Sequence, residues 1–309
     1  MRDIIFLIAG IILLYLGGEA LVHSATRVAL LLRVSPLVIG LTLVAFGTSA
    51  PELAATLVAS FKGVGDVAFG NVIGSNIANL GLVLGLVALV RPLETTVRFV
   101  TQEVPFMLFT GGLLFVLAKD GALGRLEGLL FLFFLAIFLW LLMHRDGSVG
   151  ALDPGEKRAP WGRVFFYVCG VFLGVALLSA GANVLVEGAV GIARRLGVSE
   201  RVIGLTLVAV GTSLPELVST LVAAYRRAGD IILGNIIGSN IMNVLAILGL
   251  TSLIHPFSFS REKILFDLAV MGAFFLVSWA MLVHRRSLGR VKGAVLFAGY
   301  LFYVYYLYL

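Results

Sequence analysis

The chain consists of apolar runs of about 20 residues separated by short polar connections. A helix of that length crosses a hydrocarbon core of roughly 30 Å, because each residue adds about 1.5 Å. Breaks at charged residues, Gly and Pro divide the sequence into ten such runs. We therefore predict ten membrane-spanning helices, at residues 3–31, 37–61, 67–90, 102–118, 126–143, 164–193, 202–225, 231–254, 265–283 and 292–308.

The two halves of the chain repeat one another. A shift of 164 residues aligns GLTLVAFGTSAPEL at 40–53 with GLTLVAVGTSLPEL at 204–217, and GDVAFGNVIGSNIAN at 65–79 with GDIILGNIIGSNIMN at 229–243. Between positions 38 and 59, 18 of 22 residues match their partners, including every polar residue of the first copy. Apolar composition alone would not repeat polar residues at fixed spacing. We assign a first repeat to 1–143 (motif 36–92), a linker to 144–163 and a second repeat to 164–309 (motif 200–256).

An odd number of spans in each half makes the second half enter the membrane from the opposite side. The sequence thus predicts an all-α polytopic membrane protein with two inverted five-helix repeats. The connections after the odd-numbered spans, together with Arg27 and Lys292 at the adjoining span ends, contain 14 of the 23 Lys and Arg residues. By the positive-inside rule these connections, the linker among them, face the cytoplasm, and both termini are extracellular.

Composition narrows the class of protein. The chain is 60% hydrophobic and 13% charged, with a mean hydropathy of +1.06, which places it in the lipid bilayer and leaves almost no sequence for a soluble domain. Its net charge of +6 is scattered over short connections, so a nucleic-acid partner is not predicted. We find no nucleophile constellation or phosphate-binding loop that indicates an enzyme. No cofactor and no obligatory protein partner is predicted.

Two glutamates lie well inside predicted spans, Glu52 in the second and Glu216 in the seventh. A carboxylate near the bilayer centre is costly, so such residues are rare unless they face partners or a water-filled pathway. Each glutamate directly follows a proline, Pro51 or Pro215. Proline frees the carbonyl four residues back and disfavours helical geometry at the residue before it, so both helices should break there. A carboxylate beside freed backbone oxygens indicates cation coordination.

Further oxygen donors accompany the two glutamates. Each proline motif contributes a threonine and a serine, and the following span contributes a serine and an asparagine four residues apart, on one helix face. These donors are Thr48, Ser49, Ser75 and Asn79 in the first half, and Thr212, Ser213, Ser239 and Asn243 in the second. All-oxygen ligation favours hard cations such as Ca²⁺ and Na⁺ over zinc or copper. Two carboxylates can neutralise one Ca²⁺ or two Na⁺, and a third Na⁺ would make exchange electrogenic.

Structural roles compete with functional ones at several positions. A single buried glutamate can pair with another polar side chain, but its repetition beside proline favours a functional site. The motif glycines serve close helix packing as readily as ion access. Asn76 and Asn240 lie one residue off the serine–asparagine face, and we predict structural contacts for them. Glu19, His23 and Glu187 lie toward span ends, where hydration explains them.

The segments GTSAPE at 47–52 and GTSLPE at 211–216, with GNVIGSNIAN at 70–79 and GNIIGSNIMN at 234–243, carry a family resemblance. They resemble the two alpha repeats of the calcium/cation antiporter superfamily, most closely its prokaryotic sodium/calcium exchangers. The general pattern covers essentially the whole chain. The resemblance implies exchange of Na⁺ for Ca²⁺ across the cell membrane by alternating access, with a site between spans 2, 3, 7 and 8 and with spans 1 and 6 sliding.

Carried over by position, the resemblance implies a calcium site that uses the carboxylates of Glu52 and Glu216 and the carbonyls of Thr48 and Thr212. The implied sodium sites share these four residues and add Ala45, Ser49, Ser75, Asn79, Ala209, Ser213, Ser239 and Asn243. The transported ions are substrates, and no resident cofactor is implied.

The resemblance also bears on the driving ion. Potassium-coupled relatives typically carry Asp where this chain has Asn243, which argues against potassium dependence. Proton-coupled relatives typically have Gly-Asn motifs followed by Glu and His, whereas this chain has Gly-Thr-Ser-x-Pro-Glu without an adjacent His. Sodium is therefore favoured. H⁺/Ca²⁺ exchange is the nearest alternative, because a buried glutamate can carry protons, and a passive cation channel is a further one.

Overall fold

The computed structural model of the chain describes residues 2–145, 160–197 and 209–307. Its contacts group the chain into two compact units. The first comprises Met1–Thr48 and Asp146–Asn235, and the second comprises Ser49–Arg145 and Ile236–Leu309. Each unit therefore takes segments from both sequence repeats. Most of the predicted linker at 144–163 and the start of the predicted span at 202–225 lie outside the described residues.

The first unit is built around two long helices. Its elements are α1 (Arg2–Leu32), α2 (Pro36–Ile39), a π-helical segment (Gly40–Val44), α3 (Ala45–Thr48), α9 (Trp161–Arg195), α11 (Ala209–Thr212), α12 (Leu214–Tyr225) and the start of α13 (Gly229–Met242). The Ser35 side chain accepts a hydrogen bond from the Val38 amide at 3.3 Å. Pro36 at the first position of α2 has no N–H group that would need an acceptor. Ser35 and Pro36 therefore form a favourable N-terminal cap for this short helix.

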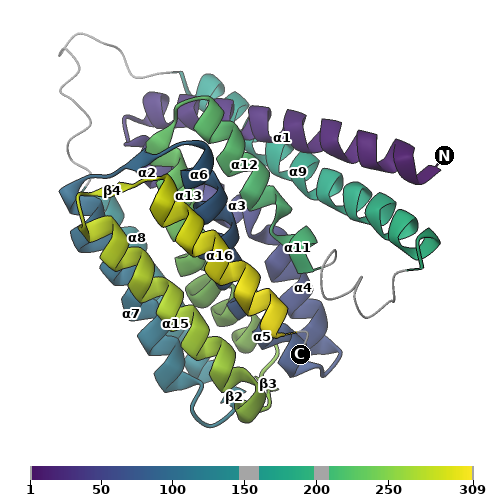
Figure 1. Cartoon of the computed structure of the whole chain (residues 1–309). Coiled ribbons are helices and arrows are strands. Elements are labelled where there is room, and N and C mark those ends of the chain that lie inside the picture. The colour runs from purple at the N-terminus through teal and green to yellow at the C-terminus, as the bar shows by residue number, and fades with distance from the viewer. Residues whose placement is uncertain (1, 146–159, 198–208, 308–309) are drawn as a thin grey trace. The chain divides into compact units, whose positions relative to one another are not determined.

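α1 and α9 pack against each other along most of their length, as Figure 1 shows for the purple and teal helices. Glycines make this contact close. A Cβ at Gly17 would lie 2.7 Å from the Leu178 nitrogen, and one at Gly174 would lie 2.6 Å from the Leu21 nitrogen. Lipid supplies no hydrophobic drive for helix association, so small residues that let backbones approach stabilise such a pair.

The second unit holds the remaining helices. They are α4 (Ala50–Phe61), α5 (Gly65–Ala78), α6 (Gly85–Val90), α7 (Val104–Leu117), α8 (Arg125–Arg145), the rest of α13, α14 (Gly249–Ile254), α15 (Arg261–Val283) and α16 (Arg290–Tyr306). Three π-helical segments lie between them, at Asn79–Leu84, Phe99–Glu103 and Asn243–Leu248. The first and third are separated by the repeat distance of 164 residues, so the duplication extends to this irregular geometry.

Two short strand pairs join connections of the second unit. β1 (Leu93–Glu94) pairs antiparallel with β4 (Ser287–Leu288), and β2 (Ala122–Leu123) pairs antiparallel with β3 (Phe257–Ser258). Each pair joins a strand of the first repeat to one of the second. The sequence prediction contained only helices, and these pairs were missed because two residues carry no readable alternation. Pairing satisfies backbone groups where the helices end.

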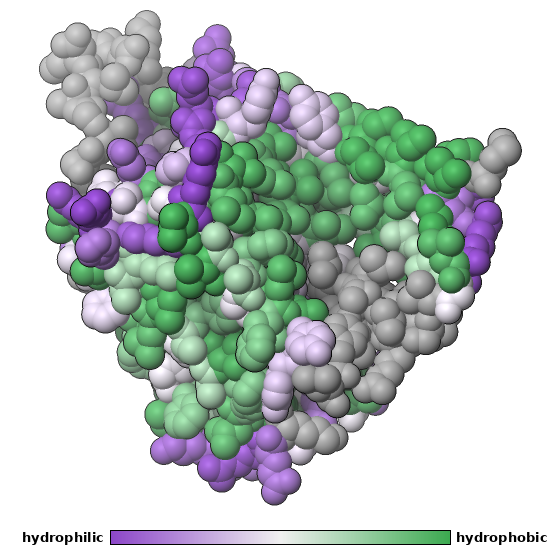
Figure 2. Space-filling model, in the orientation of Figure 1, coloured by the Kyte–Doolittle hydropathy of each residue, from purple (hydrophilic) through white to green (hydrophobic). Residues whose placement is uncertain are grey.

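The helices of the second unit present an apolar surface. Figure 2 shows hydrophobic residues over α15 and α16, with hydrophilic residues at the ends of the helices. Phe302 on α16 is 70% exposed, and Leu276 on α15 is also exposed. Among described residues, seven helices are long and apolar enough to cross a membrane, or eight if the broken pair Pro36–Thr48 and Ala50–Phe61 counts as one span. The chain is thus a helical polytopic membrane protein, and a helix overlaps every predicted span. The total of ten spans and their inversion stay predictions.

Candidate functional site

Both helices that carry the predicted glutamates are interrupted, one residue earlier than expected. α3 ends at Thr48 and α4 begins at Ala50, with φ −85° and ψ 7° at Ser49 between them. The corresponding break has φ −90° and ψ 4° at Ser213. The residue before each proline keeps helical geometry, because a proline in the first turn occupies a position whose N–H has no partner within the helix. The serines take up the bend in the bridge region of backbone space.

The Glu52 turn in the second unit is held by an asparagine of the next helix. Glu52 is 1% exposed and lies in the first turn of α4. Asn71 of α5 donates its amide to the Glu52 carbonyl at 3.2 Å and to the Thr56 hydroxyl at 2.9 Å. Thr56 in turn donates to the Glu52 carbonyl at 2.7 Å. This network fixes the backbone of the helix turn that carries the glutamate.

The Glu216 turn in the first unit has a larger network. Glu216 is also 1% exposed. Asn235 of α13 donates to the Ser219 hydroxyl at 3.2 Å and to the Thr220 hydroxyl at 3.1 Å. Both hydroxyls donate to the Glu216 carbonyl, at 3.0 Å and 2.5 Å. The Asn235 oxygen accepts from the Thr48 hydroxyl at 3.2 Å, which ties the end of α3 to α13.

Asn71 and Asn235 are positioning residues that the sequence reasoning missed. Both occur in the repeated Gly-Asn pairs at 70–71 and 234–235, so the signal was present in the aligned copies. Their partners, however, are side chains and carbonyls on a different helix, which no local pattern reveals. They support the glutamates indirectly, because they hold in place the helix turn that carries each carboxylate.

The predicted asparagine donors begin the two symmetric π-helical segments. Asn79 and Asn243 are 1% and 0% exposed, and each is the first residue of its segment. π-helical turns are rare and often occur at functional sites. Among the described residues, neither amide atom of Asn79, nor the Asn243 oxygen, nor the Ser239 hydroxyl has a hydrogen-bond partner. A buried polar group without a partner costs about 1–3 kcal/mol, so this cluster fits oxygen ligation of an ion.

Asn76 and Asn240 make structural contacts of different kinds. The Asn76 oxygen accepts from the Asn243 amide at 3.2 Å, and its own amide contacts the Met271 sulfur at 3.5 Å. Asn76 therefore orients the Asn243 side chain through its amide nitrogen, and the Asn243 oxygen takes no part in this hydrogen bond. Asn240 donates to the Ile236 carbonyl of its own helix at 2.7 Å.

The predicted site residues divide evenly between the two units. The first unit contains Ala45, Thr48, Ala209, Thr212, Ser213 and Glu216, and the second contains Ser49, Glu52, Ser75, Asn79, Ser239 and Asn243. In the second unit the helix that carries Glu52, α4, packs against α5, which carries Ser75, and against the π-helical segment that begins at Asn243. In the first unit α12 packs against α3 and α9. Ligation by each of the twelve residues stays a prediction.

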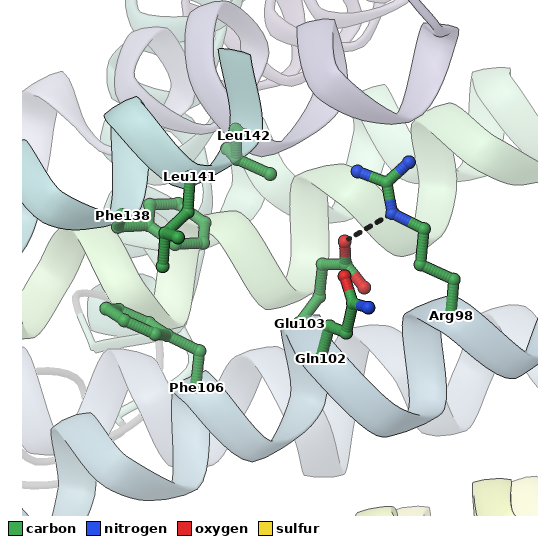
Figure 3. Close-up of a pocket in the computed structure, with 7 residues that line it drawn as sticks. All are labelled: Arg98, Gln102, Glu103, Phe106, Phe138, Leu141 and Leu142. Carbon is green, nitrogen blue, oxygen red and sulfur yellow. Dashed lines mark ion pairs between the residues drawn. The ribbon is translucent and has the colours of Figure 1, made fainter. Parts of the chain in front are cut away.

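Two further observations limit the alternatives. No three His, Cys, Asp or Glu side chains group together in the described ranges. Figure 3 shows a separate cavity in the second unit between the helix ends of α7 and α8, where Arg98 and the buried Glu103 form an ion pair of 3.6 Å. Its volume of about 20 Å³ accommodates little more than one water molecule. This cavity is no candidate for the functional site.

Comparison with known proteins identifies a family. The profile of the family described as "Sodium/calcium exchanger protein" matches residues 3–144 and 166–309, on either side of the predicted linker. CaxA of Alkalimonas amylolytica is 38% identical over 98% of both chains. The sodium/calcium exchanger MaX1 of Methanosarcina acetivorans is 35% identical, over 99% of this chain and 97% of its own length.

A solved structure shows the same architecture. The sodium-calcium exchanger NCX_Mj, in crystals soaked with 10 mM Na⁺ and zero Ca²⁺, superimposes with a TM-score of 0.85. The two sequences are 32% identical, and the match covers 98% of each chain. Sequence and fold therefore agree over nearly the whole protein.

Proposed function

The chain belongs to the sodium/calcium exchanger family, and from this premise we propose that it is an antiporter that exchanges Na⁺ for Ca²⁺ across the membrane. One observation carries the proposal. Two glutamates, each 1% exposed, follow prolines at matching helix breaks in the two repeats. A buried carboxylate in a membrane protein is costly, and a transported cation supplies a charge that compensates it.

The donor set favours these two ions. In our proposal Ca²⁺ binds the carboxylates of Glu52 and Glu216 and the carbonyls of Thr48 and Thr212. Na⁺ uses the same four residues together with the other serine, asparagine and alanine positions carried over from the family. Carboxylate, carbonyl, hydroxyl and amide oxygens suit hard cations that accept variable coordination.

Charge balance determines whether the exchange moves net charge across the membrane. Two carboxylates neutralise one Ca²⁺ or two Na⁺, so a third Na⁺ makes each cycle move net charge. We propose an electrogenic cycle of alternating access, in which the ten spans form two inverted repeats and both termini lie outside the cell. The repeated motifs and the Lys and Arg bias of the connections support this arrangement.

Proton coupling is the alternative that one observation favours. Glu52 and Glu216 are buried carboxylates, and such groups carry protons in other transporters. Under that alternative a pH gradient alone would drive Ca²⁺ uptake, and the serine and asparagine donors would have no Na⁺ to bind.

Flux measurements in vesicles test the proposal. Purified protein is reconstituted into liposomes, and uptake of radioactive calcium is followed with Na⁺, K⁺ and H⁺ gradients imposed one at a time. We expect uptake only when the vesicles are loaded with Na⁺. Uptake that ignores the Na⁺ gradient and follows the pH gradient would replace sodium by protons, and single-channel currents would replace the carrier by a channel.

A further inference from the structure

An apolar groove runs between α1 and α12 in the first unit. Its volume is about 410 Å³, and its walls include Ile11, Leu14, Val218, Leu221 and Tyr225. The α1 part of the wall spans nine residues from Ile11 to Glu19, or about 12 Å of helix, which is close to the thickness of one leaflet of the hydrocarbon core. The groove lies in predicted membrane spans, where lipid tails are the surrounding solvent.

A second cavity of about 450 Å³ continues along the same two helices. It is lined by His23, Arg27 and Leu30 farther along α1, and by Arg226, Arg227 and Asp230 after the end of α12. Both helices thus pass from apolar to basic residues in the same order. Arg226 marks the junction, because its Nε donates to Glu19 at 3.2 Å and the pair closes the end of the apolar groove.

The charge of the second cavity is not cancelled by the protein. Neither Arg27 nor Arg227 forms an ion pair with a carboxylate in the described part of the chain. Asp230 is the one carboxylate among the described lining residues of this cavity, and Arg226 is neutralised by Glu19. Arg27 also lines a neighbouring cavity of about 280 Å³ together with Arg163 of α9. The end of the groove therefore carries an excess of positive charge.

We propose that this groove binds an anionic phospholipid, with one acyl chain along the apolar part and the phosphate against Arg27 and Arg227. The apolar groove matches the acyl chain of such a molecule, and the uncompensated guanidinium groups at its end match the phosphate. A soluble anion would not use the apolar 410 Å³, and a zwitterionic lipid would not use the excess charge. The Lys and Arg bias predicts that this end of α1 faces the cytoplasm, where anionic lipids are enriched.

Native mass spectrometry of the purified full-length protein tests the assignment. The protein is incubated with equal amounts of phosphatidylglycerol and phosphatidylcholine, and with glycerol phosphate in a separate arm. Basic residues near an anionic surface contribute roughly fivefold each to binding, so we expect wild type to prefer phosphatidylglycerol by at least about tenfold. The double variant Arg27→Gln/Arg227→Gln should lose this preference, whereas the charge-matched control Arg125→Gln/Arg290→Gln should keep it.

A second variant tests the apolar part. Val218→Trp fills the groove without changing its charge and should weaken binding of both lipids by severalfold. The melting temperature of each variant in phosphatidylcholine nanodiscs verifies folding, and the lipid preference of wild type is informative without any variant. Three results would overturn the proposal: equal binding of the two lipids to wild type, an equal loss in both double variants, or displacement of the lipid by glycerol phosphate alone.

Discussion

The two glutamate turns differ more in their surroundings than in their own sequence. In the second unit Asn71 holds the Glu52 turn through two hydrogen bonds and is itself half-buried. In the first unit Asn235 makes three hydrogen bonds and is 1% exposed. The repeats thus keep the carboxylate and its supporting asparagine, while the number of partners has diverged.

One sequence difference and one contact between the repeats account for this divergence. Ser219 supplies a hydroxyl where the first copy has Ala55, so Asn235 gains a partner that Asn71 lacks. The Thr48 hydroxyl donates a hydrogen bond to the side-chain oxygen of Asn235, and this bond joins the two repeats inside the first unit. We infer that the carboxylates do equivalent work, whereas the supporting networks do not contribute equally to stability.

The largest expected effect concerns the shared feature. Glu52→Gln and Glu216→Gln each leave one carboxylate against a divalent ion, and an uncompensated charge at membrane depth costs about 2.5–3.5 kcal/mol on insertion scales. Each variant should therefore lose about 100-fold or more in Na⁺-dependent Ca²⁺ uptake. Glu262→Gln, at an exposed position in the first turn of α15, is the control and should transport normally. Residual turnover in one variant but not the other would show that the halves are not equivalent.

The second prediction addresses the supporting networks. Asn235→Ala should cost about 1–3 kcal/mol of stability, because several buried hydrogen bonds are lost together. Asn71→Ala should cost about 1 kcal/mol, since fewer bonds are lost at a half-buried position. Melting temperatures of the purified variants in detergent measure the difference, with wild type in parallel. Equal shifts for the two variants would mean that the extra bonds of Asn235 contribute nothing.

The asparagines at the π-helical segments offer a third contrast. The Asn243 side chain is anchored by Asn76, whereas the Asn79 side chain has no hydrogen-bond partner among the described residues. An ionised aspartate at 243 has no proton to donate to the Asn76 oxygen. Asn243→Asp should therefore keep its hydrogen bond to Asn76 only when the aspartate is protonated. Its uptake should fall severalfold as the pH rises, while wild type stays flat over the same range. A pH-independent Asn243→Asp would show that the Asn76 contact does not control this side chain.

The smallest effect tests the origin of the asymmetry. Ser219→Ala restores the residue found in the first copy and should cost about 0.5–1.5 kcal/mol, the value of a single net hydrogen bond. The reciprocal Ala55→Ser should change stability by less, because a new hydroxyl must also be ordered. Both changes are read as melting temperatures in the same detergent. A larger loss from Ser219→Ala than from Asn235→Ala would place the serine, rather than the asparagine, at the centre of the network.

Much of this site was readable from the sequence because its residues are repeated. The helix breaks beside Glu52 and Glu216 were predictable from the repeated proline motifs, although each lies one residue earlier than expected. The ligand roles of the two glutamates and of the serine–asparagine donors also follow from polar residues at fixed spacing, and they stay predictions. The supporting role of Asn71 was not predicted, since its partners are on another helix. The π-helical turns that begin at Asn79 and Asn243 were also missed, because apolar sequence around them gives no sign of a wider helical turn. Helices were therefore predictable, and the contacts between them were not.

The central claim is that the two glutamate turns serve one ion-binding site, and calcium binding by isothermal titration calorimetry tests it most directly. Purified wild type in Na⁺-free detergent buffer should bind one Ca²⁺ per chain. Glu52→Gln and Glu216→Gln should each abolish that binding, because both carboxylates are needed to neutralise the same ion. Two Ca²⁺ per wild-type chain, with one retained in each single variant, would contradict the account and show two separate sites.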